Sequence, residues 1–380
     1  MAQFGKKFQP NDKTTVTTNL HEAIPLTGTL VSGTYGTFPS DTNVRTYTHG
    51  MFQSVFDYPY LSSSANHIFD LSVGFHTNSV ADASELSAAD RRKRVNLYNS
   101  MAQVLVGFDQ NGTLRKYDEN GDITEGSKYD KVFYINFSRL LYKDEIQKGT
   151  FSLTMKMSGN YADPKETLTY ADQGAASDYR INSPAGEYGV LYVTKQTGST
   201  LSAAPTAPYN TQFANTGSNS LAFAGLIFYQ AGVIVLPVTG HGVNGAFPDV
   251  GTGELQYQYS GSAFGTGNLA QMQASGTVDE FANNFRRRLE SISFNNTTEL
   301  QSSIYFCRIG HNEFNYSGNP SYITNAKINV KEESTDTPVS YVTTVGLYSE
   351  ENELLAVAKL SEPLRKTPET EYVLRVRLDY

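Results

Sequence analysis

The sequence predicts a mainly β protein, with antiparallel sandwich or jelly-roll-like sheets and two amphipathic helices. Three observations lead to this prediction. The 380 residues include 25 Tyr, 21 Phe and 31 Gly but no Trp, and such a composition is typical of sheets joined by many turns. Short segments rich in β-branched and aromatic residues alternate with segments rich in Gly, Pro, Asn and Ser. The period of an amphipathic helix is clear only near residues 87–106 and 278–290.

Residues 1–24 are polar and show no clear period, so we expect an N-terminal arm. Such an arm either clasps a neighbouring subunit or remains a loose terminus, and the sequence favours neither. Residues 25–158 are expected to form a β-rich lobe with one helix, because short strand-like segments separated by turns begin here. Its candidate core includes the apolar side chains Ile68, Leu71, Val73 and Phe75.

The first helix is predicted for about residues 87–106. Ser87, with Asp90 three residues later, forms a plausible N-terminal cap, and Gly107 ends the helix. The basic run Arg91–Arg94 is expected to be a solvated face, with an acidic neighbour or a nucleic-acid backbone as the alternative. Its apolar face is expected to contain Val95, Tyr98, Ala102 and Leu105.

The segment Asp118–Asp122 carries side-chain oxygens at alternate positions, as the start of a calcium-binding loop does. The sixth and twelfth positions of such a loop would hold Ile123 and Tyr129 here, where calcium binding requires Gly and Glu. We therefore predict a turn between two strands. Further strands are predicted at Val132–Phe137 and Gly149–Met157.

Residues 159–275 are rich in small and turn-forming residues and are expected to form a loop-rich insertion that includes the strand Tyr188–Thr194. Leu221–Val238 is the most apolar stretch of the chain, and its length approaches that of a membrane span. Gln230–Gly232 divides this stretch, and β-branched residues crowd its second half. A buried hairpin over residues 221–238 is therefore the preferred interpretation, and no membrane span is expected.

A C-terminal lobe, residues 276–380, is expected to contain the second helix followed by strands. Thr277–Glu280 forms a capping box, and Arg286–Arg288 complements the helix dipole near the C-terminal end. Strands are predicted at Ser303–Ile309 and Ala326–Glu332. The apolar face of the helix is expected to comprise Val278, Phe281, Phe285, Leu289 and Ile292.

The last 41 residues predict three strands. Tyr341–Tyr348 is rich in β-branched and aromatic residues, a polar tetrapeptide at Ser349–Asn352 suits a tight reversal, and Glu353–Leu360 returns. A loop punctuated by Pro363 and Pro368 follows. The final strand alternates strictly between two sets of side chains, so one face is expected to be buried. The two sets are Tyr372, Leu374, Val376, Leu378 and Tyr380, and Val373, Arg375, Arg377 and Asp379.

Charge and cysteine content limit the possible functions. The formal charge of −8 and the isoelectric point of about 5.3 argue against broad nucleic-acid binding, which needs a basic surface. Cys307 is the single cysteine, so neither an intramolecular disulfide nor a cysteine metal cluster is possible, and we expect a small buried apolar side chain there. The N-terminus has no apolar segment typical of a secretory signal, which fits folding in a reducing cytoplasm.

Motifs of catalysis and ligand binding give no candidate residues. The histidines His21, His49, His67, His76, His241 and His311 have no metal-ligand spacing. Gly265–Ala270 formally matches a dinucleotide-binding fingerprint, but it follows a polar loop rather than an apolar strand. A nucleophile elbow and a phosphate-binding lysine loop are both missing from the sequence. We therefore predict no enzyme activity and no catalytic, cofactor-binding or metal-binding residues, although sequence alone does not exclude a pair of acidic residues.

Three parts of the chain carry a resemblance to virion structural proteins of contractile-tailed bacteriophages of marine bacteria. The first is TTVGLYSEENELLAVAKL with the closing VRLDY, which resembles a hairpin of fibre-attachment and collar-type tail proteins. The second is SMAQVLVGFDQNGTLRKYDENGDIT together with FYINFSRLLYKDEIQKGTFSL. The third is SISFNNTTELQSSIYFCRIGHNEFNYSGNP. The resemblance covers most of the chain outside residues 160–275.

The resemblance implies a building block of a virion, assembled in the host cytoplasm and acting through contacts between subunits. The expected partners are other virion proteins and further copies of the chain in a ring, trimer or hexamer, and neither nucleic acid nor a membrane. The tail is the favoured place, at the baseplate or the fibre attachment, with the neck and the capsid surface as alternatives. A module that binds host glycan through the Tyr-rich loop Asn312–Tyr322 is a further alternative. A depolymerase is the least favoured, because no fixed-period repeat is visible.

Overall fold

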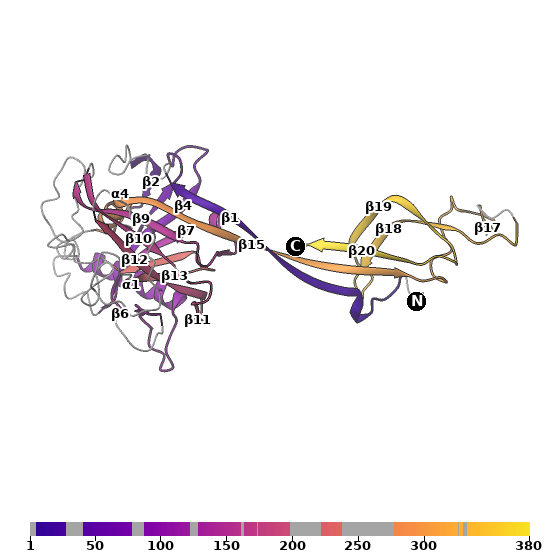
Figure 1. Cartoon of the computed structure of the whole chain (residues 1–380), viewed down its shortest axis with the longest axis horizontal. Helices are drawn as coiled ribbons and strands as arrows, with labels where there is room; N and C mark the ends of the chain where they lie inside the picture. The colour runs from indigo at the N-terminus through magenta and orange to yellow at the C-terminus, as the bar shows by residue number, and fades with distance from the viewer. Residues whose placement is uncertain are drawn as a thin grey trace. The chain divides into compact units, whose positions relative to one another are not determined.

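A computed structural model gives the structure of the protein. It describes residues 5–27, 41–77, 87–121, 128–160, 163–172, 174–197, 222–237, 277–325, 327–329 and 333–380. The chain divides into two compact units. Unit 1 consists of Met1–Leu20 and Glu299–Tyr380, and unit 2 of His21–Thr298. The boundaries fall inside two long strands, β1 (Lys13–Thr27) and β15 (Leu289–Ile309), so each of these strands contributes residues to both units (Figure 1).

Unit 2 contains most of the described strands and the two long helices of the described residues. The helical segments in the described part of the chain are η1 (Pro10–Asp12), η2 (Asp41–Asn43), α1 (Ala88–Leu105), α2 (Arg139–Tyr142) and α4 (Val278–Arg288). The strands of unit 2, apart from its portions of β1 and β15, are β2 (Val44–Thr46), β3 (Phe52–Phe56), β4 (His67–Phe75), β5 (Tyr117–Asp118), β6 (Lys128–Tyr129), β7 (Lys131–Phe137), β8 (Glu145–Ile146), β9 (Ser152–Asn160), β10 (Asp163–Ala171), β11 (Arg180–Ser183), β12 (Gly186–Thr197), β13 (Ala222–Phe228) and β14 (Val233–Pro237).

A large antiparallel sheet forms the centre of unit 2. Its strands follow the order β15-β9-β10-β12-β13-β14-β7-β4-β3-β2. The residues that the structure describes are therefore mainly β with two long helices, and the predicted fold class is confirmed. The predicted hairpin over residues 221–238 is confirmed as well, because β13 and β14 pair with each other and lie between β12 and β7.

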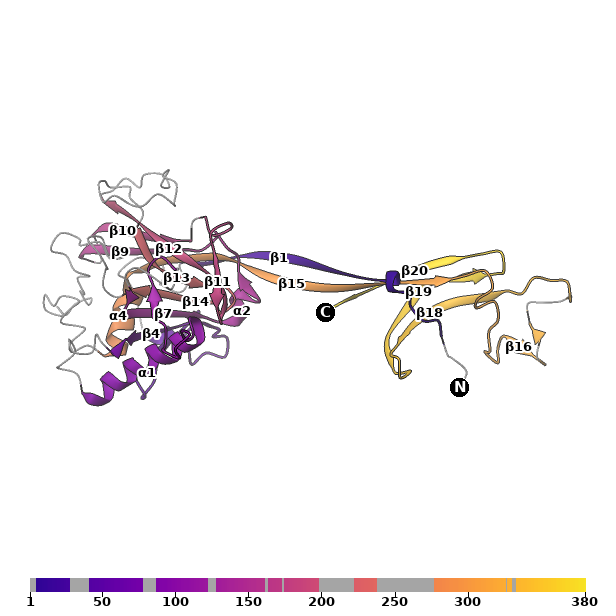
Figure 2. The same ribbon diagram turned by 90° about the horizontal axis from the view of Figure 1, so that it is seen from below.

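The sheet of unit 2 is buried on both faces. Successive side chains of a strand point to opposite faces, so Tyr134 and Ile135 of β7 enter two different apolar clusters. Helix α1 covers one face with Tyr98 and Leu105, and Figure 2 shows it lying along β4 and β7. On the other face α4 inserts Phe281, which is fully buried.

Helix α1 begins at the predicted cap. The Asp90 N–H donates to Ser87 Oγ at 3.1 Å, and Gly107 follows the helix with φ +71°. One side chain differs from the expectation of a solvated basic face: Arg94 is 1% exposed, and its guanidinium lies 4.8 Å from the ring centre of Phe75. The buried stripe of α1 therefore includes Arg94, while Val95 is only half-buried. Stacking on aromatic rings lets an arginine pack inside an apolar region.

Helix α4 ends earlier than predicted, at Arg288, and Leu289 already belongs to β15. Leu289 and Ile292 are buried as expected, but they reach the core from the strand. The β-branched and aromatic content that follows Arg288 favours extended backbone. Arg286 is 1% exposed, so its role is not confined to the helix dipole as predicted. The capping box at Thr277–Glu280 stays a prediction.

The segment expected as a loop-rich insertion contributes strands β10, β12, β13 and β14 to the middle of the sheet. The predicted strand Tyr188–Thr194 lies inside β12, whose register with β10 runs from Glu166↔Thr197 to Ala171↔Tyr192. The low apolar content of residues 159–275 as a whole conceals these short strands. Pairing with apolar neighbours on both sides is a tertiary effect that a local sequence window does not contain.

Unit 1 is built from the end of β15 and from the C-terminal strands. These strands are β16 (Ile323–Thr324), β17 (Lys327–Ile328), β18 (Ser340–Tyr348), β19 (Leu354–Lys366) and β20 (Tyr372–Asp379). Strand β20 pairs with β15 in a register that runs from Ser302↔Asp379 to Ile309↔Tyr372, and β18 pairs with β19. The three C-terminal strands are where the sequence predicts them, except that β19 continues through Pro363.

The units differ from the four segments expected from sequence, namely 1–24, 25–158, 159–275 and 276–380. The first twenty residues belong with the C-terminal strands in unit 1, and α4 belongs to unit 2. Strand β1 includes residues expected in the arm, and β15 extends the predicted strand Ser303–Ile309 toward the N-terminus as far as Leu289. Both differences follow from two strands that are much longer than the usual five or six residues.

Candidate interaction surface

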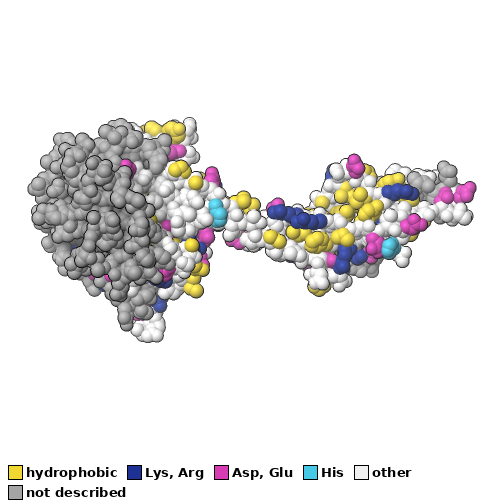
Figure 3. Space-filling view, in the orientation of Figure 1, with side chains coloured by type: hydrophobic (Ala, Val, Ile, Leu, Met, Phe, Trp, Pro, Cys, Tyr) yellow, Lys and Arg dark blue, Asp and Glu magenta, His cyan; other side chains and the backbone are white. Residues whose placement is uncertain are grey.

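Unit 1 buries few apolar side chains. Among its described residues, the buried hydrophobic ones are Ile304, Ile309, Val339, Leu347 and Val376. Its large exposed hydrophobic side chains are Phe8, Val16, Leu20, Phe314, Tyr316, Tyr341, Tyr348, Leu354, Leu355, Val357, Val373 and Tyr380. Figure 3 shows such side chains on the surface of this unit together with Lys and Arg. A concentration of exposed apolar side chains on a folded unit marks a surface that binds another molecule.

The densest part of this surface is the outer face of the β18–β19 hairpin, which we define as Thr344, Gly346, Tyr348, Leu354, Val357 and Lys359. In the antiparallel register Thr344 pairs with Lys359, Gly346 with Val357, and Tyr348 with Leu354. The alternate pairs Val345↔Ala358 and Leu347↔Ala356 point to the opposite face, where Leu347 is 5% exposed. Both faces of the hairpin therefore carry apolar side chains. Leu347 is buried on the inner face, whereas Tyr348, Leu354 and Val357 of the outer face are exposed.

Gly346 shapes this outer face. A Cβ placed on Gly346 would lie 2.9 Å from Tyr348 Cε2 and 3.4 Å from Leu354 Cδ1. The missing side chain thus lets the tyrosine and leucine lie across the strand pair. Leu355 is the extra residue where the register shifts between Leu347 and Tyr348, and its side chain is 67% exposed. A bulge of this kind re-aims side chains at the end of a hairpin.

A polar turn closes the hairpin, as the sequence predicts. The Ser349 N–H donates to the Glu353 carbonyl at 2.8 Å, and the Glu353 N–H donates to Ser349 Oγ at 3.1 Å. Asn352 takes φ +65°, a conformation that asparagine tolerates better than most residues. The turn presents three exposed carboxylates, those of Glu350, Glu351 and Glu353. One end of the hairpin is therefore strongly acidic.

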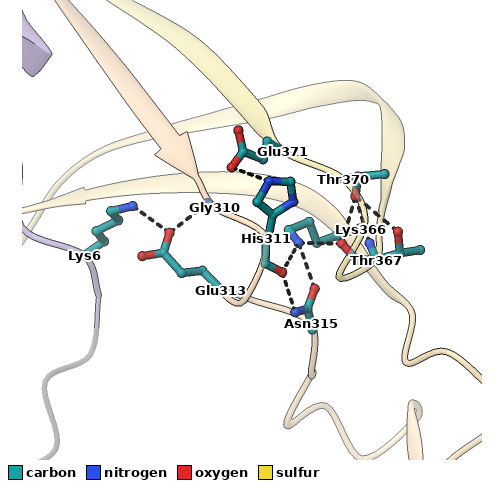
Figure 4. A network of polar contacts seen from close by, with 9 residues as sticks. All are labelled: Lys6, Gly310, His311, Glu313, Asn315, Lys366, Thr367, Thr370 and Glu371. Atoms are coloured by element: carbon teal, nitrogen blue, oxygen red, sulfur yellow. Dashed lines mark hydrogen bonds and ion pairs between the residues drawn. The ribbon is translucent and has the colours of Figure 1, made fainter.

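A buried lysine fixes the loop at the end of β15 (Figure 4). Lys366 is fully buried, and its Nζ donates to the His311 carbonyl at 3.0 Å, to Asn315 Oδ1 at 2.8 Å and to the Thr367 carbonyl at 2.7 Å. Three acceptors match the three donors of an ammonium group, which compensates for its removal from water. The loop after residue 310 is therefore anchored, although Phe314 and Tyr316 are more than half exposed.

The N-terminal residues of unit 1 are held by two carboxylates. Glu313 accepts from Lys6 Nζ at 2.6 Å and from the Gly310 N–H at 2.8 Å, and these bonds hold its pKa below the usual range. Asp12 accepts from the Gln9 N–H at 2.7 Å and pairs with Arg308 at 2.6 Å, which likewise lowers its pKa. Phe8 contacts the Tyr305 ring at 5.4 Å. Residues 5–12 are thus tied to unit 1.

The histidines that the structure describes lie in separate surroundings. His67 bonds Asp70 at 2.9 Å, His21 contacts Thr297 Oγ1 at 3.2 Å, and His311 pairs with Glu371 at 2.8 Å. His49 stacks on Tyr47, and burial lowers the pKa of the His76 imidazole, which lies beside the Tyr98 ring. His241 and Gly265–Ala270 lie outside the described residues.

Cys307 was predicted to be buried, but it is half-buried. It lies in β15 opposite Leu374 of β20, and part of its side chain is exposed there. Partial burial, together with the charge of Asp12, raises the pKa of the thiol, so the thiolate needed for nucleophilic chemistry is disfavoured.

The segment Asp118–Asp122 begins in the β5–β6 pair, where Asp118 is buried and bonded to Lys128. Residues 122–127 lie outside the described residues. Within the described ranges no group of three or more His, Cys, Asp and Glu side chains is able to hold a metal ion.

Asp172 is the acidic residue in unit 2 whose surroundings most resemble those of a catalytic group. It is 1% exposed, and burial raises its pKa to about 6. Its oxygens accept from the N–H groups of Gly149 at 2.7 Å and Phe151 at 2.9 Å and from Tyr229 Oη at 3.1 Å. These donors join the loop before β9 to the end of β10, so the carboxylate acts as a structural brace.

The outer face of the β18–β19 hairpin was not singled out by the sequence as a binding face. The signal available in the sequence is the unbroken apolar run Leu354–Ala358, which indicates that both faces of this strand are apolar, because a strand that buries one face alternates. None of the helices in the described ranges is long and apolar enough to cross a membrane. Comparison of the chain with protein-family models, with curated proteins and with solved structures gave no match.

Proposed function

We propose that the protein is a structural component of a tailed-phage virion and that it acts by binding other subunits through unit 1. The observation that carries the proposal is the exposed apolar face of the β18–β19 hairpin beside a small buried core. Burial of apolar surface is the main driving force of association, and a face of Tyr, Leu and Val side chains supplies it. The resemblance to virion structural proteins includes this same hairpin.

Assembly, rather than catalysis, suits the polar groups of unit 1 as well. Its buried ions are satisfied within the unit, since Lys366 has three acceptors and Asp12 has two donors. Such groups fix loops and termini in place, so that a surface is rigid before it meets its partner. Rigid surfaces lose less conformational entropy on binding.

Within the virion we favour the tail, at the baseplate or the fibre attachment, because the hairpin resembles that of fibre-attachment proteins. The neck and the capsid surface are the alternatives. Mass spectrometry of purified particles separated into heads and tails tests the proposal. Detection in the tail fraction is expected, detection with heads favours the alternatives, and absence from both fractions contradicts the proposal.

A host-glycan-binding role is a second candidate, supported by the loop at the end of β15. Phe314 and Tyr316 are 52% and 59% exposed, and Lys366 anchors the loop that carries them. Exposed aromatic rings on a fixed loop suit stacking against sugar rings. Binding on a glycan array that is lost in Tyr316→Ala and kept in Tyr58→Ala, an exposed tyrosine of unit 2, would support this role.

A further inference from the structure

The outer face of the β18–β19 hairpin carries Lys359 at one end, and the turn beyond its other end carries three carboxylates. Glu350, Glu351 and Glu353 are exposed at the turn, and Lys359 is exposed at the other end of the defined face. Lys359 lies six positions after Glu353, which corresponds to about 20 Å of extended strand. This separation exceeds the Debye length of about 8–10 Å at ordinary salt, so the two ends do not neutralise each other within one chain.

The middle of the same face is apolar. Gly346 and Val357 form the central pair, and Tyr348 with Leu354 lies between this pair and the turn. Val357 and Leu354 are 52% and 54% exposed, so their burial remains available to a partner. In the described chain neither Lys359 nor the three turn glutamates form an ion pair.

We propose that this hairpin face binds the same face of a second copy of the chain about a two-fold axis near Gly346 and Val357. A two-fold axis that lies in the plane of the face and runs perpendicular to the strands brings the acidic turn of each copy onto Lys359 of the other. It also brings Val357 onto the apolar centre of the partner. A face that carries opposite charges at its two ends and an apolar middle is complementary to itself in this arrangement. Such an interface is isologous and closes after two copies.

This inference rests on the proposed assembly function and names the contact that one such surface makes. The defined face has six residues, fewer than the roughly 20–30 residues a side of a stable interface, so we expect weak association, with a dissociation constant of about 10 µM to 1 mM. Weak contacts of this kind become durable when other contacts hold the subunits together. Salt is expected to weaken the dimer, because charge pairs at its rim contribute to it.

Charge reversal gives a sharp test in the full-length chain. Lys359→Glu places carboxylates at both ends of the face, and the triple change Glu350→Lys, Glu351→Lys and Glu353→Lys places ammonium groups at both ends. Each variant alone should dimerise about tenfold more weakly, because a two-fold interface contains every charge contact twice. An equimolar mixture should form a heterodimer at least as tight as the wild-type dimer, because each end then meets the opposite charge.

Sedimentation velocity at a series of concentrations measures these equilibria, with one variant fluorescently labelled to detect the heterodimer. Lys327→Glu is the matched control, because Lys327 is an exposed lysine of unit 1 outside the hairpin, and it should leave dimerisation unchanged. Circular dichroism confirms that the variants keep their fold. A wild-type chain that stays monomeric at millimolar concentration, or variants that dimerise as the wild type does and show no preference for the heterodimer, would overturn the inference.

The outcome for the proposed function is read separately. Presence of the protein in purified particles, combined with charge-reversed chains that dimerise normally, rejects the hairpin contact and leaves the assembly function in place. Absence from particles, combined with heterodimer formation by the two variants, rejects the virion proposal and leaves the contact in place.

Discussion

Unit 2 and unit 1 are both made of antiparallel strands, yet they use apolar side chains in opposite ways. Unit 2 places them on both faces of its sheet, where α1 and α4 cover them, and even Arg94 and Arg286 are buried there. Unit 1 buries few and leaves Tyr348, Leu354 and Val357 on its surface. The contrast indicates that unit 2 is stabilised by its own core, whereas unit 1 has apolar surface left for association.

The two units also offer carboxylates whose pKa values shift in opposite directions. In unit 2 the buried Asp172 accepts three hydrogen bonds and still has a raised pKa, so its burial dominates. In unit 1 the carboxylates of Asp12 and Glu313 have lowered pKa values, because hydrogen bonds and cations favour their charged forms. Low pH should therefore favour the folded state through Asp172 and weaken the contacts made by Asp12 and Glu313. Each of the following predictions tests one side of the contrast.

The largest expected effect is loss of packing in unit 2. Phe281 is fully buried, with its ring 6.1 Å from that of Phe75 and 5.8 Å from that of Phe133. Phe281→Ala should lower the free energy of unfolding by about 3–5 kcal/mol. Leu355→Ala is the matched change in unit 1, where the side chain is exposed, and it should cost less than about 0.5 kcal/mol. Urea denaturation of both variants measures the difference, and equal losses would refute the contrast.

The second effect concerns Asp172 and has a defined sign. Its pKa is about 6 in the folded state and near 3.8 when unfolded, so the folded protein binds this proton more tightly. The contribution of Asp172 is therefore greatest below pH 4 and is lost as pH rises through about 6, by about 3 kcal/mol.

Asp172→Asn removes that pH dependence and replaces one carboxylate oxygen by an NH₂ group. One of the three donors, Gly149 N–H, Phe151 N–H or Tyr229 O–H, then loses its acceptor, which should lower the free energy of unfolding by about 2 kcal/mol at pH 4. Urea unfolding of the variant and the wild type at pH 4 and pH 7 provides the measurement. A stability difference between the two proteins that is the same at both pH values would show that Asp172 titrates normally.

Two glycines provide a smaller, matched comparison. A Cβ at Gly232, which has φ +63°, would lie 2.3 Å from Cε1 of the buried Tyr142 ring, whereas a Cβ at Gly346 meets the exposed Tyr348 at 2.9 Å. Gly232→Ala should cost about 2 kcal/mol, because both the backbone and the ring must shift. Gly346→Ala should cost about 0.5 kcal/mol, because Tyr348 can rotate into solvent. Thermal unfolding distinguishes them, and a larger loss for Gly346→Ala would contradict this description of the two surfaces.

The smallest effect is local to the N-terminal residues of unit 1. Asp12→Asn weakens the contact with Arg308, so the amide protons of residues 5–13 should exchange faster while those of β20 do not change. The wild-type protection of these amides should also decrease as pH falls through the lowered pKa of Asp12, where the charge is lost. Hydrogen exchange followed by mass spectrometry measures both, and unchanged protection would mean that other contacts hold the segment.

The sequence predicts the elements of this fold better than their assembly. The Ser87 cap and the hairpin at Gln230–Gly232 are local patterns, and the structure confirms both. Burial alternates along β20 as predicted, but only Val376 is buried and Tyr380 is exposed. Strand β10 and the length of β15 depend on pairing with residues far along the chain, which no local pattern contains. The burial of Arg94 likewise depends on Phe75 and Phe281 from distant elements.

The candidate surface was only partly predictable. Its strands and its polar turn follow from local residue types. The exposure of Val357 and Leu354 does not, because an apolar run is equally typical of a strand that is buried on both faces. Only the absence of a covering element in the described structure of unit 1 distinguishes a binding face from a core strand.

The most direct test of the central claim is covalent footprinting of aliphatic and aromatic side chains in the free chain and in purified particles. The account predicts that Tyr348, Leu354, Leu355 and Val357 are labelled in the free protein and strongly protected after assembly. Leu61 and Ile181, the most exposed apolar side chains of unit 2, should lose much less labelling. Equal labelling of the hairpin in the free and the assembled protein would contradict the account.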